Sequence, residues 1–85
     1  MRSRATSRFW ARYEHLPANV RRVAVKQYRL WLSNPRHPSL QFKRVGEFWS
    51  ARVTDDYRAL GLLEQDTVIW FWIGSHAEYE RLVVR

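Results

Sequence analysis

Val68-Ile69-Trp70-Phe71-Trp72-Ile73 is the stretch of sequence that decides the fold. Successive side chains of a strand point to opposite faces of a sheet, and this run is apolar at every position. Such a pattern predicts a central strand that is covered on both sides. Gly74-Ser75 ends the run, and residues 76–83 are expected to close the chain as a helical turn, with Ser75 as its N-cap.

The segments before this strand also read as strands. Residues 40–44 alternate apolar and polar, which is typical of a half-buried strand. Two further strands are expected over residues 48–53 and 57–63. A turn is expected at 54–56, where Thr and Asp side chains can cap their own backbone, and a second turn at 64–66. With the central strand, these segments predict an antiparallel meander of three or four strands.

The first forty residues favour helices. The spacing of Phe9, Trp10 and Tyr13 predicts a short helix over residues 5–15, with a brief strand at the very start as an alternative. Leu16-Pro17 breaks it, and a second helix is expected over residues 18–33. Its apolar residues recur at three and four positions, the mark of one buried face: Val20, Val23, Ala24, Tyr28, Trp31 and Leu32. The prolines of residues 34–38 predict an irregular segment. The fold class is therefore α+β, with two N-terminal helices packed on one face of the sheet.

Composition and charge limit the classes of function. The 85 residues are expected to form a single domain over 1–85, and 46% are hydrophobic and 15% aromatic, which excludes a disordered basic tail. The chain contains no cysteine, so disulfides, thiolate zinc sites and cysteine nucleophiles are excluded; this suits a reducing cytoplasm. No segment resembles a membrane span or a secretory signal.

The net charge of +7 arises mainly from arginine, which supplies thirteen of the fifteen cations. Arginine forks match phosphate oxygens and stack on flat rings, so this excess favours nucleic acid or an acidic protein as partner. The alternative is a basic, solvated surface with no specific ligand.

Residues on the predicted strands and just after them form a candidate catalytic cluster. Lys43, Arg52 and Arg58 fall on three successive strands, and His76 and Tyr79 follow the fourth. This set suits metal-free RNA cleavage, in which a 2′-hydroxyl attacks the adjacent phosphate, cations stabilise the developing charge and a histidine protonates the leaving oxygen. The three histidines lie far apart, and no P-loop, dinucleotide fingerprint or nucleophile elbow is present, so we expect neither metal nor cofactor.

A structural reading of the same residues stays open. The arginines at 52 and 58 can pair with Asp55, Asp56 or Glu64. In that reading, His76 is a solvated residue at a helix start and Tyr79 packs in the core.

Three stretches resemble toxins of the RelE/ParE superfamily. Residues 48–60, FWSARVTDDYRAL, are similar to the family pattern y-S-x-R-[IV]-x-x-x-[YH]-R-[AVL]. Residues 34–43 resemble the run that leads into the sheet, and residues 70–79 resemble the last strand with its H-x-x-Y exit. The resemblance covers about residues 16–82.

This resemblance implies the toxin of a type II toxin–antitoxin pair, with two N-terminal helices on a twisted antiparallel sheet. RelE-like members cut mRNA in the ribosomal decoding site without metal, whereas ParE-like members inhibit DNA gyrase and lack the nuclease residues. It implies that Arg58 and Arg52, with Lys43, stabilise the phosphate, and that His76 and Tyr79 supply acid–base or stacking groups. The family's carboxylate or extra lysine base has no match. The expectation is a RelE-like mRNA endonuclease; the alternatives are a gyrase inhibitor and a weakly toxic relative that only binds antitoxin or RNA.

The resemblance also implies partners. The antitoxin of such a pair is acidic, so the cations of the second helix can face either it or RNA: Arg21, Arg22, Lys26 and Arg29. We expect mRNA and the ribosome as further partners, no membrane, and DNA only indirectly through an antitoxin complex. The expected location is the bacterial cytoplasm.

Overall fold

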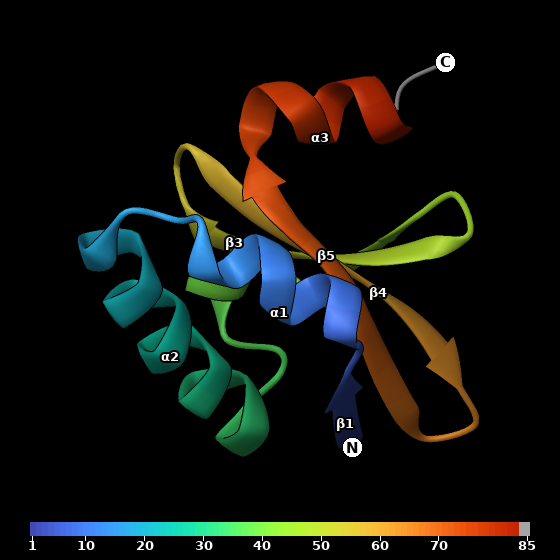
Figure 1. The fold of residues 1–85 in the computed structure, drawn as a ribbon. Helices are drawn as coiled ribbons and strands as arrows, with labels where there is room; N and C mark the ends of the chain where they lie inside the picture. Colours follow the sequence, from blue (N-terminus) through green and yellow to red (C-terminus); the bar gives the residue numbers. More distant parts are fainter. Residues whose placement is uncertain (84–85) are drawn as a thin grey trace.

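A five-stranded sheet forms the centre of the computed structural model, which describes residues 1–83 (Figure 1). The strand order is β1-β5-β4-β3-β2. Along the chain the elements are β1 (Arg2–Ala5), α1 (Ser7–Glu14), α2 (Ala18–Ser33), a 3₁₀ turn (Pro38–Leu40), β2 (Lys43–Val45), β3 (Phe48–Thr54), β4 (Tyr57–Glu64), β5 (Thr67–Ser75) and α3 (His76–Val83). The α+β class with two N-terminal helices on the sheet is confirmed.

The sheet differs from the expected meander in one strand. The four residues of β1 pair with β5 in parallel, so the sheet is mixed and has five strands rather than three or four. The brief N-terminal strand that the sequence allowed is therefore present. It carries little signal of its own because four residues are too few for a clear alternation, and its pairing joins distant parts of the chain.

The segment before β2 also differs from the expectation. Residues Pro38–Leu40 form the 3₁₀ turn, and β2 begins only at Lys43. The His37 ring accepts a hydrogen bond from the Ser39 N–H at 3.2 Å, which caps this turn. Leu40 is buried by the turn, so its apolar character reflects core packing rather than a strand.

A β-bulge sets which apolar side chains of β5 face each side of the sheet. The register pairs Leu60 with Trp72 but Gly61 with Trp70, so Phe71 is the extra residue. Before the bulge Trp70 points to the face that α1 and α2 cover, and after it Ile73 does so. Trp72 points to the opposite face, where α3 packs. The expectation of a strand covered on both sides is confirmed.

Two hydrophobic clusters separate the layers. The larger lies between the sheet and α1 and α2, which sit together over one face (Figure 1), and it is centred on Trp31, Leu40 and Trp70. The smaller joins Leu60 and Trp72 to Tyr79 of α3. The expected helical turn is thus an eight-residue helix with a core contact of its own.

The buried face of α2 is narrower than predicted. Val20 and Trp31 are buried, but Tyr28 is 43% exposed and Leu32 51% exposed. The expectation that Tyr28 and Leu32 belong to the buried face is therefore wrong. Helical periodicity identifies an apolar side of a helix but not how much of it a neighbouring helix covers. No helix within residues 1–83 is long and apolar enough to cross a membrane.

Candidate functional site

The strand register places three cations on one face of the sheet. Lys43 pairs with Ser50, and two residues further along β3 Arg52 pairs with Arg58. Directly paired residues point to the same face, as do residues two apart on one strand. Ser50 also pairs with Leu60, which packs beneath α3. The three cations therefore lie on the α3 side of the sheet.

Arg58 is held by the turn between β3 and β4. Its Nη1 donates to the carbonyl oxygens of Thr54 at 2.5 Å, Tyr57 at 3.1 Å and Asp55 at 3.3 Å. Within residues 1–83 its Nε and Nη2 have no hydrogen-bond partner, so part of the guanidinium fork stays available. The sequence allowed a pairing of Arg58 with a carboxylate; the contacts observed are with backbone carbonyls instead.

Arg52 is tied to the same turn through a carboxylate. Its Nη2 forms an ion pair with Asp55, which the structural reading of the sequence had anticipated. The backbone carbonyl of Arg52 accepts a hydrogen bond from the Gln27 side chain on α2 at 3.3 Å. The Arg52 side chain is half-buried whereas that of Asp55 is exposed, so the pair is open to competition from another anion.

The start of α3 brings a histidine to the turn that holds both arginines. The backbone N–H of His76 donates to the Asp56 carbonyl at 2.6 Å. Ser75 caps the helix, since its Oγ accepts from the Glu78 N–H at 3.2 Å, which confirms the predicted cap. His76 Nε2 lies 3.4 Å from a Glu80 carboxylate oxygen.

Tyr79 and Lys43 differ in exposure. Tyr79 is buried in the small cluster, and its ring centroid lies 5.7 Å from that of His76. Lys43 on β2 is exposed. The site therefore combines a buried phenol and a half-exposed imidazole on α3, two arginines held at the β3–β4 turn, and Lys43 on β2 opposite Ser50 of the same sheet face. No group of three or more His, Asp or Glu side chains in residues 1–83 is arranged to hold a metal ion.

Two contacts of the site were not predicted. Glu80 follows His76 by four positions, a spacing at which helical side chains meet, so the sequence did carry a signal for this pair. Gln27 lies 25 positions from Arg52, whose carbonyl it contacts. No local sequence pattern predicts a contact over that separation.

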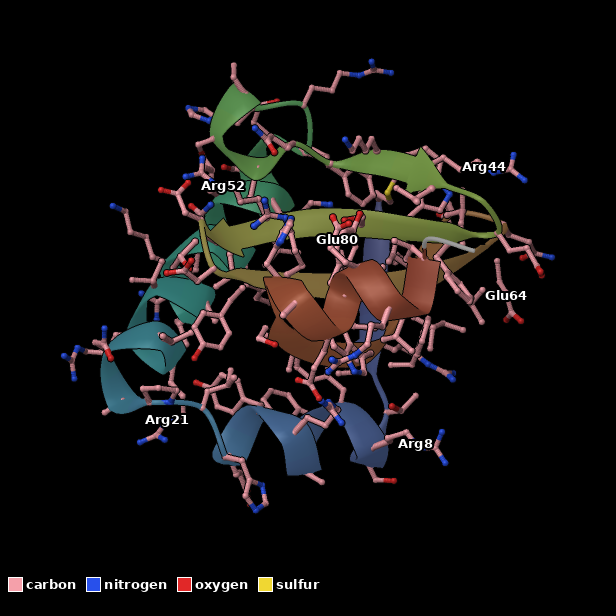
Figure 2. All side chains as sticks on the ribbon, turned by 90° about the horizontal axis from the view of Figure 1, so that it is seen from above. Arg8, Arg21, Arg44, Arg52, Glu64 and Glu80 are labelled. Carbon is pink, nitrogen blue, oxygen red and sulfur yellow. The ribbon has the colours of Figure 1, made fainter. Side chains whose placement is uncertain are left out.

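Within residues 1–83, the cations of α2 form no hydrogen bond or ion pair with the residues of this site. Arg22, Lys26 and Arg29 are exposed, and Arg21 donates through Nη1 to the Leu16 carbonyl at 2.5 Å. Figure 2 shows Arg21 at the connection of α1 and α2, apart from Arg52 on β3 and Glu80 on α3. The positive charge is thus divided between α2, which we call the helix side, and strands β2, β3 and β4, which carry Lys43, Arg52 and Arg58.

An apolar groove opens on the helix side. A cavity of about 360 Å³ lies between α1, α2 and the sheet, with Phe9, Trp10 and Tyr28 among its lining residues. Trp10 is 50% exposed. Aromatic side chains thus form much of the lining of this groove.

Residues 18–81 match the family model described as ParE-like toxin domain. No curated protein sequence matches the chain. Among solved structures, the YoeB/ParE toxin from Agrobacterium tumefaciens has a TM-score of 0.69 at 16% identity, over 89% of this chain and 99% of that one. The RelB-RelE antitoxin-toxin complex from Methanococcus jannaschii gives 0.70 at 17% identity, over 93% and 96%. YafQ from E. coli gives 0.66 at 15% identity, over 93% and 98%. At these identities the likeness shows a shared fold.

Proposed function

The chain belongs to the family of ParE-like toxin domains, and we propose that it is a metal-independent endoribonuclease that cuts ribosome-bound mRNA in the cytoplasm. One observation carries the proposal. The register gathers Lys43, Arg52 and Arg58 on the sheet face that α3 covers in part, and α3 begins with His76 at the turn that holds both arginines. Such a cluster offers positive charge and a titratable imidazole to one phosphate.

The chemistry follows from these groups. The RNA 2′-hydroxyl attacks the adjacent phosphorus and loses its proton to solvent, while the bond from phosphorus to the 5′-oxygen breaks. Arg58 and Arg52 stabilise the charge that builds on the phosphate oxygens. His76, as imidazolium, gives the leaving 5′-oxygen its proton. The products are a 2′,3′-cyclic phosphate and a 5′-hydroxyl.

The contacts of two side chains support the parts that we propose for them. Arg58 is oriented in advance, because its Nη1 is held by three carbonyl groups of the hairpin and the rest of its fork can meet the phosphate. Tyr79 is buried, which favours support of the His76 ring over stacking on a base.

Single-turnover cleavage of mRNA on programmed ribosomes tests the proposal. Arg58→Gln should cut about 10²–10³-fold more slowly than the parent chain, the loss typical of removing one transition-state donor. Arg44→Gln is the matched control, because Arg44 lies on β2 beside Lys43 but points to the other face, with its Nε bound to the Gly46 carbonyl. A folded Arg58→Gln variant that cuts as fast as the parent would refute the assignment.

One observation favours a second function. Arg52 and Arg58 both have hydrogen-bond partners within the β3–β4 hairpin, as expected of cations that shape a binding surface. That surface would suit a protein target, and DNA gyrase is the one that the ParE-like family suggests. A supercoiling assay with purified gyrase separates the two functions, since inhibition without any mRNA cleavage would favour this second one.

We also propose that an acidic antitoxin occupies the helix side. The groove presents Trp10 and Tyr28 to apolar side chains. The exposed cations Arg22, Lys26 and Arg29 of the same helix α2 offer positive charge to an acidic chain. Related solved structures include antitoxin-toxin complexes of RelB with RelE. Co-purification with the protein of a neighbouring reading frame, compared between the parent and a Trp10→Ser and Tyr28→Ser double variant, tests this surface. Equal retention of that protein would contradict it.

A further inference from the structure

Arg12 connects α1 to the end of β5 and to α3. Its Nε donates to the Ile73 carbonyl at 3.0 Å, and its Nη2 lies 3.2 Å from each carboxylate oxygen of Glu78. Its guanidinium carbon is 5.2 Å from the centre of the Trp72 ring. A planar guanidinium can make these three contacts together, whereas a lysine ammonium cannot. We call these four residues the Arg12 clamp.

Gly74 leaves the space that this arrangement needs. A Cβ at Gly74 would lie 2.6 Å from the Trp72 ring and 3.1 Å from a Glu78 carboxylate oxygen. The ring and the carboxylate therefore occupy the place of a missing side chain. Glu78 also accepts from the Ser75 hydroxyl at 3.4 Å, so the clamp contacts the N-cap of α3.

The rest of α3 has few attachments. An isolated helix of eight residues is marginal in water, and Tyr79 is the one residue of α3 within 76–83 that is buried. Besides the clamp, α3 is bound to the rest of the protein by the hydrogen bond from the His76 N–H to the Asp56 carbonyl. Within residues 1–83, the Arg12–Glu78 pair is the one ion pair that joins distant parts of the chain.

We propose that Arg12 and Glu78 are positioning residues for the candidate site. They hold α3 across the end of β5, and this fixes the direction in which His76 and Tyr79 face the strand-borne cations. Neither residue reaches the phosphate. The inference rests on the proposed RNA cleavage, but the position of α3 can be measured without RNA.

Amide hydrogen exchange and cleavage kinetics test the proposal on Arg12→Gln, Glu78→Gln and the double variant. We expect protection of the α3 amides to fall roughly three- to tenfold, since the pair is half-exposed and opens locally. The kcat for cleavage should fall by a similar factor while KM stays unchanged, because Lys43, Arg52 and Arg58 remain on the sheet. The double variant should be no worse than either single one, as for two partners of one interaction.

Arg8→Gln is the matched control, since it removes the same charge from α1 at an exposed position that points away from the sheet (Figure 2). It should leave exchange and kcat at parental values. Unchanged α3 protection in Arg12→Gln would overturn the clamp, and so would an equal loss of protection in β4 and β5 or a rise in KM with kcat unchanged. A parent chain that cuts no RNA would instead refute the proposed function, and exchange alone would then decide whether the clamp holds α3.

Discussion

Gly61 lies at the bulge between β4 and β5, where a side chain has no room. A Cβ there would lie 2.7 Å from Val68 Cγ1, 3.1 Å from Trp70 Cε3 and 3.2 Å from the Ile69 carbonyl oxygen. The same bulge sends Trp70 to the large core and Trp72 to the face under α3. Gly61→Ala is therefore predicted to strain the bulge, which directs side chains of β5 into both hydrophobic clusters.

The magnitude follows from the overlap. Gly61 does not have a left-handed backbone, so the cost of alanine is steric. Overpacking a closed core site by one methyl group costs about 1–3 kcal/mol. With a cost near the middle of that range, the melting temperature of a domain of this size should fall by about 8–16 °C. Gly46→Asn is the control, because no atom lies within 4 Å of a Cβ there and asparagine tolerates its φ of 62°.

Urea denaturation followed by tryptophan fluorescence measures the effect, with an unchanged m-value as the condition for a comparison. Val68→Ala removes the atom of closest overlap, so the double variant with Gly61→Ala should be more stable than the sum of the single losses by about 1 kcal/mol. Gly61→Ala as stable as the parent, or losses that simply add, would refute the reasoning.

Three further predictions concern the turn, the core and α3. Asp55→Asn removes the carboxylate that competes for Arg52, so affinity for single-stranded RNA, measured by fluorescence anisotropy, should rise severalfold; unchanged affinity would contradict this. Trp31→Ala empties the site of a side chain that is 2% exposed and should cost about 3–5 kcal/mol in urea denaturation; a loss below about 1 kcal/mol would show that the core can collapse around the gap. Ser75→Ala removes the acceptor of the Glu78 N–H and should lower α3 amide protection by about fivefold, with β4 protection unchanged.

Local patterns predicted most of the elements. The three-and-four spacing of α2, the apolar run of β5 and the Ser75 cap are properties of neighbouring residues, and each appears in the structure as expected. The exposed positions of Tyr28 and Leu32 were missed because helical spacing says nothing about how far α1 extends over α2. The parallel pairing of β1 was missed because it depends on a strand more than sixty positions away.

The candidate site shows the same division. Sequence alone placed Lys43, Arg52 and Arg58 on successive strands, since strand spacing is local. It left open whether the arginines were free or paired, because a guanidinium selects its partners only after the turn between β3 and β4 has formed.

By itself, the sequence determined the α+β class, the order of the elements after β1 and the family, all of which depend on short-range patterns of apolar and charged residues. Only the tertiary structure decided where each face of β5 points, what holds the two arginines and how α3 is fixed. A bulge shifts the register by one residue, and that shift reverses which side each later residue faces. The contact of Arg12 with Glu78 spans 66 positions, a distance over which no local pattern carries information.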